Sequence, residues 1–570
     1  MSTQAVAELH GEPTSSSVEK YWPTVLRPRL DYLSSLDVDD DRVRALIDGD
    51  IGDIHEVIRV LNTCRNDRAP ISRIPSELLG RIFHFLSRRE ALQPRTPEAG
   101  WISVTHVCRR WRHTALQYPG LWSNIIFSLG LRWTEEMLAR SKTVPLDVLV
   151  TGTLRPRESQ LVIEHLDRTE DLHLTAPVQT LLQDLTTEPV PVLTTFEISS
   201  VPEYSPLMLP EDLFAHSAPR LQTLIIHNCV FSWPSLVFNS ITYLNIWSPL
   251  QAMYVPNTAE QFLDFLRDCP NLEDVRLYGC IPRLPLHHLH NIHMQRLKRL
   301  DVLGPARSIV GVLDHLHAVP GASLRLTVRF SMRDDRDDDS RAVIPSVSAH
   351  LGDSHHSSPL LVLSIAGGGA RRTVVVTAWT VIQASETVPT PALHMELELR
   401  RLPAIDMLTH LRDGLHLGSL RVASVDTTFN RDWSVLHWDV LFAHSMDMRH
   451  VILSGQLAAE TLFETSCGPV GAAQSNQASG YSLFPSLVTI SISRVNFIGE
   501  DHAGTSQPPA PVVQPALAWL QLQCRHNLRK VNISECWITP DIVDAMRETV
   551  TDVVWDEQVE PILSDSLEGW

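Results

Sequence analysis

The chain has 570 residues, 44% of them hydrophobic and 20% charged, which is typical of folded protein and excludes a largely disordered chain. Because single cores stop growing near ~250 to 300 residues, we expect two or more domains, or one repetitive domain with a small appendage. With 48 Lys+Arg against 66 Asp+Glu, the formal charge of −18 repels phosphate backbones and argues against nucleic-acid binding.

The first residues carry neither the basic n-region nor the apolar h-region of a secretory signal. The longest apolar run, TVVVTAWTVI at 373–382, is the length of a strand, whereas a membrane span needs ~18 residues. The eight cysteines form no C-x-x-C pair, so we expect reduced thiols rather than disulfides or zinc. A cytoplasmic or nuclear protein without membrane contact is expected.

Residues 1–19 are small and polar, and disorder is expected there. Residues 20–69 are predicted to be helical, because apolar residues recur at three- and four-residue spacing. These residues are Val43, Leu46, Ile47, Ile54, Val57, Ile58 and Leu61. The acidic run DVDDDR could suggest a calcium loop, but the loop needs glycine and glutamate where Arg42 and Asp48 stand, so a solvated helix start is favoured.

A short helix with one apolar stripe is expected within PISRIPSELLGRIFHFLSRREAL, residues 70–92. Pro75 suits the first helical position, where a missing N–H costs nothing. The stripe follows at helical spacing and consists of Leu78, Leu79, Ile82, Phe83 and Leu86.

A second amphipathic helix is expected over residues 104–115, since five apolar side chains fall within an arc of about 100°. They are Val104, Val107, Cys108, Trp111 and Ala115. Arg109 and His113 project to the opposite side, and Arg110 and Arg112 flank the stripe. A nucleic-acid-reading helix is the alternative for these basic residues, but the net charge and the lack of a second basic element favour a solvated rim.

Pro119-Gly120 ends the helix and lets Leu121 and Trp122 fold back on the core. The unit is small for independent stability and needs a partner to cover its apolar surface.

Residues 128–570 show internal repeats. Three segments fit the leucine-rich pattern L-x-x-L-x-L-x-x-N/C with leucine, isoleucine or valine at its apolar positions: Leu221/Leu224/Ile226/Cys229, Leu272/Val275/Leu277/Cys280 and Leu528/Val531/Ile533/Cys536. Looser copies keep the three apolar positions: Leu193/Phe196/Ile198, Ile241/Leu244/Ile246, Leu297/Leu300/Val302, Leu360/Leu363/Ile365, Leu417/Leu420/Val422, Met448/Val451/Leu453 and Leu487/Ile490/Ile492. Each copy is expected to add a short strand to a parallel sheet, with a helix such as 259–270 behind it. The stretches 331–341, 465–482 and 499–515 read as exposed loops.

Two other patterns have plain structural explanations. His287, His290 and His293 are three residues apart, but no cysteine or carboxylate stands beside them at ligand spacing, so surface or packing roles are favoured over a metal site. GGGARR at 367–372 lacks the ending of a phosphate loop and leads into a strand, which favours a hairpin turn. No local nucleophile or base motif supports catalysis.

Residues 70–122 resemble the F-box, in the divergent form common in basidiomycete fungi. The matching residues are Ile74-Pro75, Glu77-Leu78-Leu79, Ile82-Phe83, Leu86, Val107-Cys108-Arg109-x-Trp111-Arg112, Ala115 and Leu121-Trp122. The segment between Leu86 and Val107 is longer and richer in proline than in the common F-box. The expected fold is therefore α/β: a disordered N-terminus (1–19), a helical segment (20–69), an F-box domain (70–127) and an irregular leucine-rich-repeat-like solenoid, or horseshoe (128–570).

An F-box followed by leucine-rich repeats is similar to the substrate receptors of SCF ubiquitin ligases. The resemblance implies a non-catalytic receptor that docks on a Skp-type adaptor, and through it on a cullin, while the repeats bind an unknown substrate protein. The adaptor-binding residues it implies are Pro75, Leu78, Leu79, Ile82, Phe83, Leu86, Val107, Cys108 and Trp111. No cofactor, metal, nucleic acid or membrane is expected. The alternative is an F-box scaffold that acts outside a cullin complex.

Overall fold

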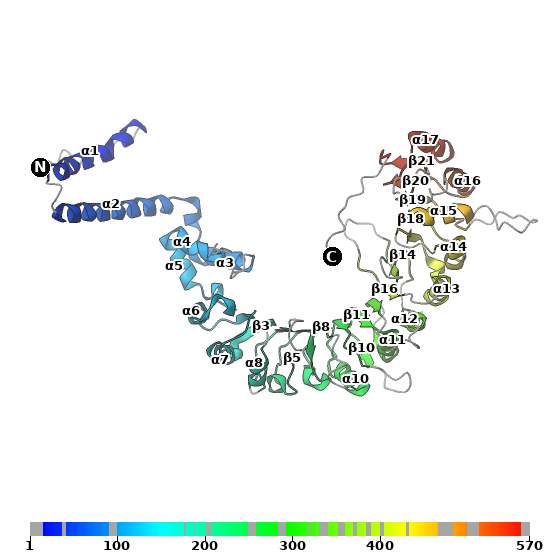
Figure 1. Cartoon of the computed structure of the whole chain (residues 1–570), viewed down its shortest axis with the longest axis horizontal. Coiled ribbons are helices and arrows are strands. Elements are labelled where there is room, and N and C mark those ends of the chain that lie inside the picture. Colours follow the sequence, from blue (N-terminus) through cyan, green and yellow to red (C-terminus); the bar gives the residue numbers. More distant parts are fainter. Residues whose placement is uncertain are drawn as a thin grey trace, which may run out of the picture. The chain divides into compact units, whose positions relative to one another are not determined.

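The computed structural model of the chain describes residues 15–36, 41–89, 100–175, 178–186, 188–200, 207–248, 258–282, 292–318, 321–329, 340–351, 359–368, 373–382, 389–398, 404–428, 433–465, 483–498 and 512–559 (Figure 1). The chain divides into two compact units: Met1–Ser123 with Glu135–Lys142, and Asn124–Thr134 with Thr143–Trp570. Most of the expected disordered N-terminus lies outside the described residues, and the first helix begins at Ser15.

The first unit is helical. Its elements are α1 (Ser15–Ser34), α2 (Asp41–Asp67), η2 (Pro70–Arg73), α3 (Ser76–Arg89), η3 (Gly100–Ser103), α4 (Val104–Val107), α5 (Arg109–Gln117), η4 (Pro119–Leu121) and most of α6 (Leu131–Ser141). Within the described residues, no helix of either unit is both long and apolar enough to cross a lipid bilayer.

The single helix expected over 104–115 is wrong, because the backbone breaks at Cys108. Cys108 is extended (φ −158°, ψ 169°), and its Sγ accepts a hydrogen bond from the Trp111 N–H at 3.5 Å, so it caps α5 instead of continuing α4. The break removes the shared stripe: Val104 is buried, whereas Val107 is 58% exposed. Helical spacing across 104–115 could not reveal a cap in its middle.

The second unit is built on one large sheet. Its strands are β1 (Asn124–Ile126), β2 (Leu146–Val150), β3 (Thr169–Thr175), β4 (Thr195–Ser199), β6 (Thr223–His227), β8 (Tyr243–Trp247), β9 (Asp274–Tyr278), β11 (Arg299–Gly304), β13 (Ser323–Val328), β14 (Val362–Gly368), β15 (Thr373–Trp379), β16 (Leu393–Glu398), β17 (Val422–Asp426), β18 (His450–Ser454), β19 (Thr489–Ser493), β20 (Lys530–Ser534) and β21 (Asp552–Trp555). Two small parallel pairs stand apart, β5 (Leu207–Met208) with β7 (Cys229–Val230), and β10 (Ile292–Met294) with β12 (Leu316–Ala318).

Neighbouring strands of the large sheet pair in parallel and in chain order from β1 to β13 and again from β17 to β21. The order reverses between these runs, because β16 pairs with β13, β15 lies antiparallel to both β16 and β14, and β14 pairs with β17. The antiparallel pairing of β14 with β15 agrees with the hairpin expected there, and residues 369–372 of GGGARR lie outside the described residues.

Helices cover one face of this sheet (Figure 1). They are α7 (Pro156–Glu164), α8 (Gln179–Asp184), α10 (Ala259–Asp268), α11 (Ala306–His315), α12 (Val343–Leu351), α13 (Ala404–Leu415), α14 (Val435–Phe442), α15 (Gln456–Glu464), α16 (Val513–Cys524) and α17 (Pro540–Thr549). Since side chains alternate between the faces of a strand, every second residue of most strands packs against the helices, and the others lie on the opposite face, from buried (Asp301) to exposed (Arg325).

The second and third apolar positions of most repeat copies are strand residues buried against the helices. Leu224 and Ile226 in β6, and Val531 and Ile533 in β20, are at most 2% exposed, and Cys229, Cys280 and Cys536 are buried after their strands. One copy was placed wrongly: in β17 the buried residues are Ala423 and Val425, and Val422 lies on the other face. The repeat copy is Leu420-x-x-Ala423-x-Val425, and it was missed because the pattern calls for a large apolar residue where Ala423 stands.

Several expectations fall on residues outside the described part of the chain. These include most of the three loops at 331–341, 465–482 and 499–515, the acidic residues 37–40, and His287 and His290. His293, which was considered on a helix face, lies in the strand β10 and is exposed.

Candidate functional site

The centre of the first unit is formed by α3, α5 and the segment that follows α5. Leu79 and Phe83 of α3 are at most 2% exposed, and the Phe83 ring lies 5.0 Å from the Trp111 ring between centroids. The buried Trp122 indole donates its Nε1–H to the Ala115 carbonyl at 2.9 Å. Leu79 and Phe83, both expected at an adaptor contact, therefore hold α3 on α5 from inside. The expected return of Leu121 and Trp122 to the core is confirmed, since both are 1% exposed.

Two close contacts fix α3 on its other side. Gly80 faces the Tyr118 ring so closely that a Cβ added at this glycine would lie 2.4 Å from Tyr118 Cδ2. One turn later, His84 Nδ1 lies 3.1 Å from the Gly120 carbonyl oxygen. The stretch Tyr118–Gly120, which follows α5, thus packs against α3 beside the face that buries Leu79 and Phe83.

Arg110 links η2 to α5. Its guanidinium donates to the Ser72 carbonyl at 2.6 Å and to the Ile74 carbonyl, just before Pro75 and the start of α3. Its expected place on a solvated basic rim is therefore wrong, while Arg109, Arg112 and His113 are exposed. Sequence spacing could not distinguish Arg110 from its basic neighbours, because the partners of Arg110 are backbone carbonyls almost forty residues earlier.

Five large apolar side chains of this region point to solvent. We call Ile71, Leu78, Ile82, Phe85 and Val107 the exposed apolar surface; they are between 40% and 71% exposed. Leu86, Cys108 and Trp111 are half-buried beside it, and Pro75 is exposed at the start of α3. On α3, the exposed residues recur at i, i+4 and i+7, about 100° per residue, so they share one face.

The stripe of α3 therefore divides into two faces. Leu79 and Phe83 face inward, whereas Leu78 and Ile82 face out, and sequence alone could not make this division. Two members were missed: Phe85, the most exposed of the five, and Ile71. Phe85 has a signal in the sequence, because it lies seven residues after Leu78 and three after Ile82.

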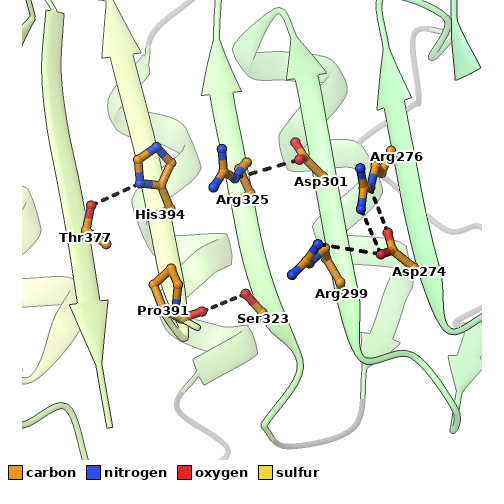
Figure 2. Close-up of polar contacts among 9 residues, drawn as sticks. All are labelled: Asp274, Arg276, Arg299, Asp301, Ser323, Arg325, Thr377, Pro391 and His394. Carbon is orange, nitrogen blue, oxygen red and sulfur yellow. Dashed lines mark hydrogen bonds and ion pairs between the residues drawn. The ribbon is translucent and has the colours of Figure 1, made fainter. Parts of the chain in front are cut away.

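A second candidate surface is the face of the large sheet that lies opposite the helices. Registered neighbours form a polar row across five strands: Asn245, Arg276, Asp301, Arg325 and His394. Figure 2 shows the contacts of Arg276, Asp301, Arg325 and His394. Arg276 donates two hydrogen bonds to Asp274, at 3.0 and 3.1 Å, and Arg325 lies 3.8 Å from Asp301.

Further polar contacts follow on both sides of the row. Arg299 lies 3.7 Å from Asp274, and His394 Nδ1 lies 3.0 Å from the Thr377 hydroxyl (Figure 2). Towards β2, His173 lies between Glu197, at 2.9 Å, and Asp147, at 3.8 Å. This network places arginine, carboxylate and imidazole groups next to one another on the face opposite the helices, with side-chain exposure from 11% at Asp301 to 54% at Arg325.

Burial shifts the pKa of Asp301 and of His394 on this face. Burial raises the pKa of Asp301 above the ordinary aspartate value, while a hydrogen bond with Tyr278 and the charges of Arg325 and Arg276 act in the opposite direction. Burial, with Arg325 nearby, lowers the pKa of His394. At neutral pH, His394 is therefore a neutral hydrogen-bonding group.

Neither surface presents an activated nucleophile or a metal site in the part of the chain that the structure describes. Burial raises the pKa of the Cys229, Cys269, Cys280 and Cys536 thiols to about 12, so these residues pack as apolar side chains. No group of three or more His, Cys, Asp or Glu among the described residues could hold a metal ion.

Comparison with known families identifies one part of the chain. Residues 71–128 match the family model described as F-box-like, which covers η2, α3, α5 and the exposed apolar surface. The match spans about one tenth of the 570 residues. No curated protein matches the chain.

Proposed function

We propose that the chain is the substrate-recognition subunit of an SCF-type ubiquitin ligase. The observation that carries the proposal is the F-box-like match at 71–128, because domains of this family typically bind Skp-type adaptors. Such an adaptor would join the chain to a cullin. The receptor itself would make no bond and would act by holding a substrate near the transferring enzyme.

The exposed apolar surface supports adaptor docking. Leu78, Ile82 and Phe85 line one face of α3, and Val107 follows on α4. Fully burying a large apolar side chain contributes about 1.5–3 kcal/mol, so covering five that are roughly half exposed contributes several kcal/mol before the costs of association. Leu86, Cys108, Trp111 and Pro75 would complete the contact at its edge. Leu79 and Phe83 would contribute indirectly, by fixing the position of α3.

We also propose that residues 128–570 form a leucine-rich-repeat-like solenoid whose open sheet face selects the substrate. The support is the run of parallel strands with helices on one face, together with the half-buried Arg, Asp and His side chains on the other. The antiparallel strand β15 is a departure from a regular repeat. In this proposal the receptor works in the cytoplasm or nucleus, with a protein substrate and no cofactor.

Affinity purification of the tagged chain tests the proposal. Wild type is expected to recover both the adaptor and a cullin, and Ile82→Asp is expected to lose both while remaining folded. Recovery of the adaptor without a cullin would favour a scaffold outside a cullin complex. Unchanged recovery with Ile82→Asp would contradict docking through α3. Candidate substrates are proteins that accumulate when the chain is removed. Their levels should no longer differ between cells with and without the chain once the proteasome is inhibited in both.

A further inference from the structure

Helix α2 carries a second apolar surface that the F-box-like region does not include. It runs for 27 residues, Asp41–Asp67, about 40 Å at 1.5 Å per residue, and none of its residues is buried. Seven of its aliphatic side chains are between 38% and 50% exposed: Leu46, Val57 and the five residues Ile47, Ile51, Ile54, Ile58 and Leu61. A soluble chain rarely leaves so many aliphatic residues on one helix uncovered.

These five residues follow one another at intervals of four, three, four and three. That is the heptad spacing of a coiled-coil seam, and at about 100° per residue it confines them to an arc of roughly 80°. We call them the α2 seam. Val60 and the two glycines of the helix, Gly49 and Gly52, lie on the other side, and no atom comes within 4 Å of a Cβ built at either glycine. The spacing thus specifies the kind of surface that would cover the seam: a helix with the same period.

The seam is self-complementary. It is aliphatic throughout, and arginines stand at the next seam positions on both sides, Arg44 and Arg65, which limits the apolar run to five layers. The helix has six acidic and four arginine side chains, so two copies meet with little net repulsion although the whole chain carries −18. In a parallel in-register pair, Asp50, whose carboxylate accepts two hydrogen bonds from Arg29, lies at the position that faces His55 of the second copy.

Helix α1 is held near the same side of α2. Arg29 donates two hydrogen bonds to Asp50, at 2.8 and 3.1 Å. Trp22, Val25 and Tyr32 lie on the same side of α1 as Arg29, and all three are exposed. Isoleucine at both seam positions favours more than two helices in a bundle. Two copies that each supply α1 and α2 satisfy this preference.

We propose that α2 is a self-association helix, and that the second copy of the chain docks along the α2 seam. The assembly places two copies of the open sheet face and of the exposed apolar surface in one particle. A ligand with two binding segments then gains avidity without any new contact to either copy. The proposal does not depend on adaptor or substrate binding, since α2 lies outside the F-box-like match.

Sedimentation velocity of the purified full chain, from nanomolar to tens of micromolar, tests the proposal. Wild type is expected to form a concentration-dependent dimer or higher oligomer. Ile54→Asp is expected to weaken self-association at least ~100-fold, because it buries a carboxylate in the middle of the seam. Val60→Asp is the matched control: Val60 is 53% exposed on the same helix but lies outside the seam, so this variant is expected to associate like wild type.

Three results would overturn the proposal. One is a wild-type chain that stays monomeric over the whole concentration range. This result contradicts the proposal whether the seam is covered by α1 of the same copy or by another protein. Another is an oligomer that survives in both Ile54→Asp and Ile58→Asp. The third is an oligomer that Ile82→Asp, in the exposed apolar surface, dissolves while Ile54→Asp leaves it intact. Because α2 has no buried residues, the thermal transition of the rest of the chain is expected to stay unchanged and to report that each variant is folded.

Discussion

Replacing Arg110 with glutamine is expected to loosen the first unit although the residue lies among exposed basic side chains. In the structure its guanidinium donates to the carbonyls of Ser72 and Ile74, which precede α3. The shorter glutamine side chain cannot span both carbonyls. The N-terminal end of α3 would then lose its attachment to α5.

The expected cost follows from these two contacts. A hydrogen bond to a charged group contributes about 1.5–3 kcal/mol, and partial exposure places each of these bonds near or below the lower limit, so together they contribute about 2–3 kcal/mol. Arg112→Gln is the matched control. Arg112 is exposed on the same helix, and a change there is expected to stay within about 0.5 kcal/mol. Arg110→Lys keeps the charge but not the forked geometry, so about half of the loss is expected.

Native-state hydrogen exchange of the full chain measures this effect locally. The Leu79 amide donates to the Pro75 carbonyl at 3.0 Å in the first turn of α3, and it is expected to exchange about 30- to 150-fold faster in Arg110→Gln. Amides of the large sheet are expected to remain unchanged. An acceleration no greater than that caused by Arg112→Gln would refute the structural role of Arg110.

Three further outcomes follow from contacts in both units. Gly80→Ala is expected to destabilise the first unit by about 1–3 kcal/mol in urea titrations, because its Cβ would lie 2.4 Å from Tyr118 Cδ2, and Tyr118→Ala in the same chain should restore part of the loss. Buried Cys229, with its pKa raised to about 12, should resist alkylation at pH 8 while exposed Cys64 reacts, and equal labelling in the native protein would contradict the buried environment. Burial lowers the pKa of His450, so the folded sheet binds this proton less tightly than the unfolded chain, and stability is lost as pH falls below 6.5. His450→Gln should flatten that loss in thermal unfolding followed from pH 7 to pH 5, and an identical slope would count against it.

The sequence predicted most of the parallel strands because their inward positions are large and aliphatic. Leu224 and Ile226 of β6 are examples, and the cysteines after three strands added an independent marker. The prediction was wrong where a small residue, Ala423, occupies an inward position. The reversed order of β14, β15 and β16 could not be predicted from the sequence, because strand order depends on pairing between segments distant in sequence.

At the candidate docking surface, sequence reasoning found the right helices but not their orientation. Leu78 and Leu79 are adjacent and equally apolar, yet one is half exposed and the other fully buried. What separates them is the contact of α3 with Trp111, Tyr118 and Gly120, three residues from a different segment. A docking test based on Leu79→Asp would therefore disrupt the core, whereas Ile82→Asp changes only a solvent-facing side chain.

Calorimetric titration of the purified chain with a purified Skp-type adaptor tests the central claim most directly. Wild type is expected to bind, and Ile82→Asp is expected to weaken binding at least ~30-fold by placing a charge in the exposed apolar surface. Ser76→Asp adds the same charge at an exposed position on the same helix, away from that surface, and should bind like wild type. Absence of binding by the folded wild type, or equal affinity of wild type and Ile82→Asp, would contradict adaptor docking through α3.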